Sequence, residues 1–122
     1  MRGPDDAVAF FRRIPLASRV RATLVLGRDP QWRMAGIEVL SYRPEVAFLD
    51  PSALAATTRR FGTSRLVAVA FQPDREVAPS AIEALQFVDV ADRCADRGLV
   101  LLDCIVIQGH RWWSLHERAS VA

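Results

Sequence analysis

The sequence predicts an α/β fold, a three-layer α/β/α sandwich with a mixed central sheet. Segments with an apolar period of 3.6 residues alternate with segments that have a period of two or are continuously apolar. Most changes of period coincide with Gly, Pro or a helix-capping residue. The chain has 122 residues, 51% of them hydrophobic, which suits one core and one domain over residues 1–122. The expected order of elements is α-β-β-α-β-α-β-β.

A helix and a hairpin are expected in the first forty residues. Pro4, followed by two aspartates, favours a helix start, and the helix should reach about Arg13. Alternating apolar side chains predict a strand over 20–26, and the segment Gly27-Arg28-Asp29-Pro30 predicts a turn. A second strand over about 32–42 should pair with the first. The apolar stripe of the helix consists of Val8, Phe10, Phe11 and Ile14.

The middle of the chain predicts a short extended piece, a helix and a buried strand. The extended piece covers 46–48. Asp50 as a cap and Pro51 as the first residue open the helix, and Gly62 closes it. The run 66–71 is apolar without alternation, as expected of a central strand that is covered on both faces.

The last third predicts a helix, a second buried strand and a short closing strand. From Pro79 the apolar period returns to 3.6 residues, and Gly98 ends the helix. The run 99–107 is the most hydrophobic strand and should lie inside the sheet, and a strand over 111–114 and a helical turn follow. The expected buried side of the helix consists of Ala84, Phe87, Val88, Ala91, Cys94 and Ala95.

The composition excludes several classes of protein. The 16 basic residues, all arginine, are nearly balanced by 14 acidic ones, and a net charge of +2 argues against nucleic acid as a partner. No apolar run approaches the length of a membrane span, and the N-terminus lacks the order of a signal peptide. We therefore expect a cytoplasmic protein with two reduced cysteines.

Several stretches of the chain resemble a known family. Gly98 to Ile107 and the tail Ser114-Leu115-His116-Glu117-Arg118 are similar to the closing strand and tail of the JAB/MPN domain of RadC-like proteins, a branch of the JAMM metalloprotease superfamily. Weaker similarity lies in 3–7, in 37–40 and in Asp50-Pro51. The resemblance spans nearly the whole chain and implies a cytidine-deaminase-like fold. We expect a single bacterial RadC-like domain without the helix-hairpin-helix module that precedes it in full-length members.

Active members of that superfamily have a zinc site, which this chain would have lost. Two histidines one residue apart and an aspartate bind Zn²⁺, a glutamate from an earlier strand activates the bound water, and a serine stabilises the oxyanion. The resemblance places Ala70 and Gln72 at the histidine positions, Glu83 at the aspartate, and Arg21 near the general base, while Ser80 matches. Alanine has no donor atom and a neutral amide is a poor zinc ligand. The resemblance therefore implies no catalytic residue, no cofactor and one weak metal candidate, Glu83.

The two vestigial positions, Ser80 and Glu83, also have a purely structural interpretation. Their spacing is that of a capping box, in which the serine hydroxyl accepts the third residue's amide hydrogen and the glutamate accepts the serine's. The sequence favours capping, with a residual weak ligand as the alternative.

Other chemically active side chains do not form a recognised template. Cys94 and Cys104 fall in apolar segments, where free cysteine behaves as a buried hydrophobe, and His110 and His116 are expected to be exposed. The pair Trp112-Trp113 should point to opposite faces of a strand. We expect both indoles to be buried, and an exposed one would be an interface candidate.

The sequence therefore predicts a catalytically inactive RadC-like domain that acts as a protein-binding or scaffold module. Its partner would be another protein or a second copy of the chain, with no membrane contact. The alternative is a JAMM-type zinc metallopeptidase with an altered site, which would need zinc. A third hypothesis is DNA-repair-associated nucleic-acid binding.

Overall fold

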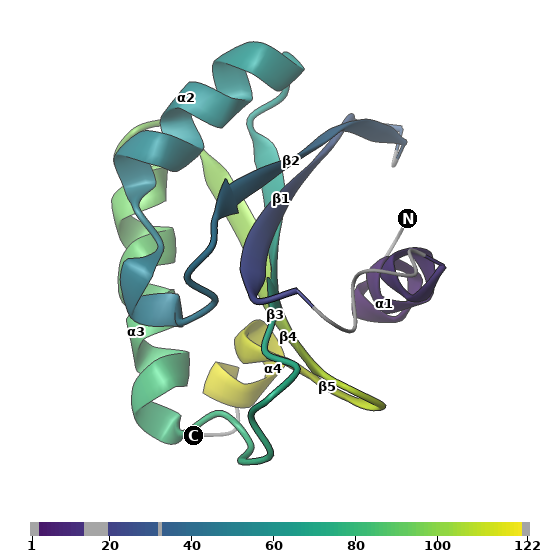
Figure 1. Cartoon of the computed structure of the whole chain (residues 1–122). Helices are drawn as coiled ribbons and strands as arrows, with labels where there is room; N and C mark the ends of the chain where they lie inside the picture. Colours follow the sequence, from purple (N-terminus) through teal and green to yellow (C-terminus); the bar gives the residue numbers. More distant parts are fainter. Residues whose placement is uncertain (1–2, 14–19, 32, 121–122) are drawn as a thin grey trace.

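The computed structural model describes residues 3–13, 20–31 and 33–120. Within them it contains one mixed five-stranded sheet of order β2-β1-β3-β4-β5 (Figure 1). β3 and β4 are parallel, and the other neighbouring strands are antiparallel. The predicted central strand, β3, therefore occupies the middle of the sheet. The strands are β1 (Ala22–Arg28), β2 (Met34–Ser41), β3 (Arg65–Phe71), β4 (Val100–Gln108) and β5 (Arg111–Ser114).

The helices lie on both faces of this sheet. α2 and α3 cover one face, and α1 lies against the other (Figure 1). Each face has its own apolar cluster, one beneath α2 and α3 and one beneath α1. None of the helices in these described ranges is long and apolar enough to cross a membrane. The helices are α1 (Pro4–Arg12), the 3-10 turn η1 (Val46–Phe48), α2 (Pro51–Phe61), α3 (Ala81–Ala95) and α4 (Leu115–Ser120).

The structure confirms an α/β protein with a mixed sheet, and the expected elements occur in the expected order. The segment 46–48 and the turn over 27–30 differ from their predictions. The segment 46–48 is a 3-10 helix, in which the amide of Phe48 donates to the carbonyl of Glu45 at 3.0 Å. β1 continues to Arg28, so the turn begins only at Asp29, whose side chain accepts hydrogen bonds from the amides of Gln31 and Arg33. Positions 14 and 32 of the predicted elements lie outside the described residues.

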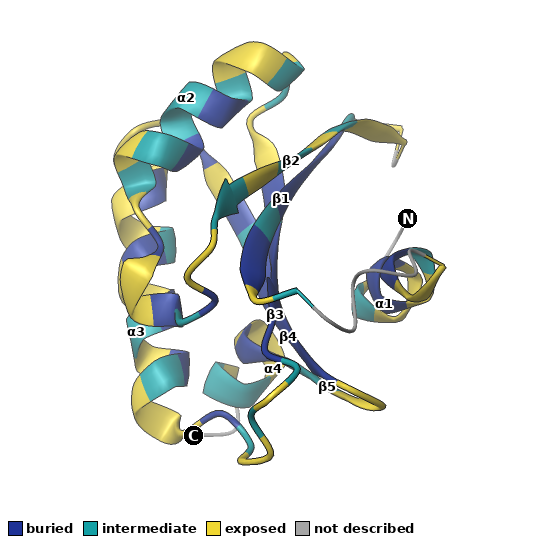
Figure 2. Ribbon diagram, viewed as in Figure 1, coloured by how far each residue is buried: buried dark blue, intermediate teal, exposed yellow. Residues whose placement is uncertain are grey.

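The buried stripe of α3 is narrower than the sequence suggests. Its buried residues are Ala84, Phe87, Val90 and Cys94. Figure 2 shows that buried and exposed positions alternate along α3. Val88 is 37% exposed and Ala95 is exposed, in contrast to the prediction. The reason is geometric, because a single helix lying on a flat sheet buries one stripe of the i, i+3, i+7 type, and residues one step outside it remain in solvent.

β2 is an edge strand whose glycine lies against an aromatic ring. Gly36 pairs with Gly27 of β1, and the ring of Phe61, the last residue of α2, lies over both. A Cβ atom at Gly27 would be 2.6 Å from the Phe61 ring. The two glycines therefore let α2 approach the sheet edge closely.

Candidate functional site

The structure brings the positions of the predicted site together at one end of the sheet. Ala70, near the end of β3, belongs to the apolar cluster on the α2 and α3 face. Ala70 pairs with Thr23 of β1, which Arg21 precedes by two residues. Gln72 follows β3, and Ser80 and Glu83 form the start of α3. The end of β3 thus faces the start of α3.

Gln72 is the centre of a buried polar network. Gln72 is 3% exposed. The amide nitrogen donates to the carbonyl of Pro44 at 2.8 Å, and the amide oxygen accepts from Gln108 Nε2 at 3.1 Å and from Arg75 Nη1 at 3.2 Å. Gln108 also donates to the carbonyl of Val77 at 2.9 Å. Both polar atoms of this side-chain amide therefore have hydrogen-bond partners within the protein.

Arg75 and Glu83 form a bidentate ion pair beside Gln72. Arg75 Nη1 donates to Glu83 Oε1 at 2.6 Å, and Nη2 donates to Oε2 at 2.9 Å. These hydrogen bonds lower the pKa of the Glu83 carboxyl and raise the pKa of Arg75. Two parallel charge-assisted bonds fix both side chains in one orientation. Glu83 is consequently held as a carboxylate by a guanidinium.

The capping box predicted from the sequence is present at the start of α3. Ser80 Oγ accepts the amide hydrogen of Glu83 at 3.1 Å, and Glu83 Oε2 accepts that of Ser80 at 2.6 Å. The same carboxylate therefore caps the helix and pairs with Arg75. This double role fixes the Glu83 side chain through contacts within the chain.

The Ser80 cap leads to a modest stability prediction. Substitution Ser80→Ala should lower the free energy of unfolding by about 1 kcal/mol, because the amide of Glu83 loses its acceptor. Ser52→Ala serves as the control, since Ser52 lies exposed in the first turn of α2 and no hydrogen bond of its hydroxyl is present among the described residues. Urea unfolding followed by circular dichroism measures both. Equal losses for the two variants would contradict a capping role for Ser80.

The other two positions of the predicted site, Ala70 and Arg21, contribute to packing and to ion pairs. Ala70 is buried in the core. Arg21 makes ion pairs with Asp74 and with Glu45, the latter at 2.8 Å. The side chains of Arg21, Glu45 and Asp74 are 45%, 42% and 63% exposed. A guanidinium cannot accept a proton at neutral pH, so Arg21 does not provide a general base.

These residues do not fit a zinc ion. In the described parts of the chain no group of three or more His, Cys, Asp or Glu side chains is placed to hold a metal. Catalytic zinc sites use three protein ligands, whereas the described cluster offers one carboxylate, and that carboxylate is paired with Arg75. The chemistry available here is hydrogen bonding and ion pairing that fasten the end of β3 to the start of α3.

Sequence reasoning did not identify Arg75 and Gln108 as members of this cluster. Arg75 lies inside the segment that carries the site resemblance, three residues after Gln72 and eight before Glu83. An arginine between two such acceptors is a weak signal for an ion pair. Gln108 is the last residue of β4 and reaches Gln72 only because β3 and β4 are parallel neighbours.

The two cysteines are buried and the two histidines are exposed, as expected. Cys94 and Cys104 are buried free thiols, and burial raises the pKa of each. A thiol with a raised pKa is a poor nucleophile at neutral pH. His110 and His116 are exposed.

The two tryptophans point to opposite faces of β5, but neither is fully buried. Trp112 pairs with Ile107 and packs against the α1 cluster, whereas Trp113 pairs with Val106. Trp113 also lies beneath the guanidinium of Arg111, 5.1 Å from its ring centroid. Both indoles are half-buried, so the prediction of two buried rings was wrong. β5 is an edge strand of four residues, which leaves part of each ring in solvent.

Neither comparison with known proteins assigns this chain to a family. No protein-family model matches the chain, and no curated protein matches it. The RadC-like resemblance therefore rests on the residues that carry it.

Proposed function

We propose that this chain is a catalytically inactive RadC-like JAB/MPN domain that acts as a protein-binding or scaffold module. The observation that supports this most is the bidentate Arg75–Glu83 pair. At the position where the resemblance assigns a zinc ligand, the carboxylate is neutralised by an internal guanidinium. The Arg75 guanidinium occupies the place at the carboxylate that a metal ion would take. The cluster therefore stabilises the fold and has no open position for catalysis.

A surface groove supports the binding part of this proposal. The groove lies between η1 and α3 and has a volume of about 450 Å³. Ile82 and Leu85 stand on its α3 side with 69% and 59% of their surface exposed. Exposed apolar side chains grouped in a groove with a charged rim are typical of protein-interaction sites. The other lining residues are Val46, Ala47, Leu49, Pro51, Gln86, Asp89, Val90 and Arg93.

Metal content tests the inactive half of the proposal. Untagged protein from zinc-supplemented medium, desalted and quantified by elemental mass spectrometry, should contain zinc near background. The variant Ala70→His, Gln72→His, Glu83→Asp with Arg75→Ala restores the ligand set that the resemblance implies. This variant should hold about one zinc per chain. About one tightly held zinc in the unaltered protein would overturn the proposal and favour a zinc hydrolase.

Site-specific photo-crosslinking in cells tests the binding half. A photoreactive phenylalanine analogue at Leu85 should form discrete adducts, either with one protein species or with a second copy of the chain. The same analogue at the exposed Arg59 of α2 is the matched control. A further substitution, Ile82→Glu, should abolish the adducts at position 85 because it places a charge in the groove. If position 85 yields no more adducts than position 59, the groove is not an interaction surface.

A further inference from the structure

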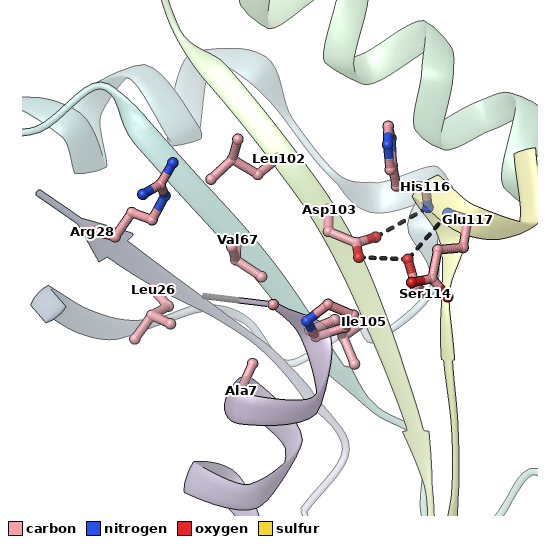
Figure 3. Close-up of a pocket in the computed structure, with 12 residues that line it drawn as sticks. Ala7, Leu26, Arg28, Val67, Leu102, Asp103, Ile105, Ser114, His116 and Glu117 are labelled. Atoms are coloured by element: carbon pink, nitrogen blue, oxygen red, sulfur yellow. Dashed lines mark hydrogen bonds between the residues drawn. The ribbon is translucent and has the colours of Figure 1, made fainter. Parts of the chain in front are cut away.

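A second cavity lies on the opposite face of the sheet from the Gln72, Arg75 and Glu83 cluster. It has a volume of about 210 Å³ and lies between the sheet and the first turn of α1 (Figure 3). Leu26, Val67 and Ile105 form its floor, and Pro4 and Ala7 line the side made by α1. Small side chains at the start of α1 leave this space open. The surface of the cavity is mostly apolar, and its polar lining residues are Arg28, Asp103, Ser114, His116 and Glu117.

The most significant of these groups is Asp103, which is only 8% exposed. Val67 pairs with Asp103 although the preceding residue, Leu66, pairs with Leu101, so Leu102 is an extra residue in β4. Such a bulge interrupts the alternation of faces. Leu102 and Asp103 consequently line the same cavity, whereas Cys104 belongs to the cluster on the other face. Bulges often redirect a side chain into a functional site.

The Asp103 carboxylate is held in one orientation. Oδ1 accepts the amide hydrogens of Cys104 at 2.8 Å and of His116 at 3.0 Å, and Oδ2 accepts the hydroxyl hydrogen of Ser114 at 2.5 Å. Figure 3 shows Asp103 and Ser114 together on one side of the cavity, with Arg28 on the opposite side. Burial raises the pKa of Asp103, and the hydrogen bonds from Ser114 and from the two amides act in the other direction.

Of the two carboxylates that line the cavity, Asp103 is buried and fixed, whereas Glu117 is exposed, so Asp103 specifies the chemistry of the ligand at this side of the cavity. A carboxylate oxygen has two lone pairs, and within the described residues Oδ2 accepts a single hydrogen bond. Its natural partner is an N–H donor, and an ammonium group would also offset the charge. The volume exceeds the ~150 Å³ of a cavity that takes up benzene. One ring with a short side chain therefore suits this space.

We propose that this cavity binds a small ligand with a single-ring apolar body and one amine that donates to Asp103. The ring would lie against Leu26, Val67 and Ile105, and the amine would reach Oδ2 of Asp103. This site is independent of the protein-binding surface proposed above. It lies on the other face of the sheet and shares no lining residue with the groove.

Three probes with the same ring and different polar groups test the proposal by ¹H–¹⁵N NMR titration. Benzylamine should bind with a Kd on the order of 1 mM and shift the amide signals of Cys104 and His116. Benzyl alcohol should bind about tenfold more weakly because its hydrogen bond is not charge-assisted. Benzoate should bind more weakly than benzylamine, since its carboxylate would be repelled by Asp103, and preferential binding of benzoate would assign the polar contact to Arg28 on the opposite side of the cavity.

Variants locate the site and assign the polar contact. Asp103→Asn keeps an acceptor for the backbone amides and should remove the preference for benzylamine over benzyl alcohol. Ala7→Leu fills the cavity and should abolish binding of both, whereas Ala9→Leu on the exposed side of α1 is the matched control and should bind as the unaltered chain does. The Ala7 and Ala9 pair remains decisive if Asp103→Asn does not fold.

Several results would overturn the proposal. Equal affinity for benzylamine and benzyl alcohol would exclude Asp103 as the anchor, and tighter binding of benzoate would place the polar contact elsewhere. Equal binding by the Ala7→Leu and Ala9→Leu variants would place the ligand outside the cavity. Absence of any shift at ~20 mM probe would exclude a site for this class of ligand.

Discussion

Replacement of Arg75 by alanine should lower the free energy of unfolding by about 2–3 kcal/mol at neutral pH. Arg75 donates two hydrogen bonds to the carboxylate of Glu83 and a third to the amide oxygen of Gln72. Its loss leaves a carboxylate in a pocket where 20% of the Glu83 side chain reaches solvent. Fully buried pairs cost about 3–5 kcal/mol when one partner is removed, and partial exposure reduces that figure here.

The effect of Arg75→Ala should depend on pH in a definite direction. Arg75 lowers the pKa of Glu83 below its ordinary value of 4.5. A carboxyl whose folded-state pKa is lowered adds stability above its unfolded-state pKa, and that stability is lost as pH falls through the folded-state value. The stability difference between the two proteins should therefore be greatest at about pH 6 to 7 and should shrink at acid pH below about 4.5.

Urea unfolding at several pH values measures this difference. The control is Arg59→Ala, which removes an exposed arginine of α2 and should change stability by less than about 0.5 kcal/mol. A loss that stays constant between neutral and acid pH would mean that Arg75 stabilises the fold by packing and not through Glu83. A loss equal to that of Arg59→Ala would mean that the ion pair contributes nothing measurable.

Substitution Gly36→Ala should destabilise the protein by about 2 kcal/mol. A Cβ atom at Gly36 would lie 2.7 Å from Cε1 and 2.8 Å from Cγ of the Phe61 ring. Among the described glycines, a positive φ occurs at Gly62, Gly98 and Gly109 and not at Gly36. Space, and not backbone conformation, therefore requires glycine at position 36, and the ring must move to admit a methyl group.

A double-mutant cycle with Phe61→Ala tests this explanation. In the Phe61→Ala background the cost of Gly36→Ala should fall to within about 0.5 kcal/mol of zero, because the atoms that clash are gone. Gly3→Ala is the control, since a Cβ atom at Gly3 would meet nothing within 4 Å. Thermal or urea unfolding provides the four free energies. A cost that persists without the Phe61 ring would show that the clash does not explain the glycine.

The sequence indicated most of the fold because its elements are delimited by local signals. α2 begins at Pro51 after the Asp50 cap and ends before Gly62, as predicted, and the capping box starts α3 where expected. Residues 46–48 were misassigned because three residues carry no measurable periodicity. The width of the buried stripe on α3 depends on the surface against which the helix packs. That surface is formed by other elements, so the sequence of the helix does not determine it.

The candidate site was only partly predictable. The sequence identified Gln72, Ser80 and Glu83 by a resemblance, and the structure places them in one polar cluster. Arg75 and Gln108 were missed, because their partners depend on loop geometry and on the parallel pairing of β3 with β4. The sequence also did not predict that Asp103 lines a cavity. This placement depends on the pairing register of β3 and β4, which produces the bulge at Leu102.

The sequence by itself determined the class of fold, the order of its elements and the absence of histidine at the two positions that the resemblance assigns to zinc ligands. Those properties follow from periodicity, capping and side-chain chemistry, which act within a few residues. The tertiary structure alone decided that a guanidinium pairs with Glu83 and that Asp103 lines an apolar cavity. Both depend on groups from separate elements meeting in space, and such contacts are set by strand register and helix packing.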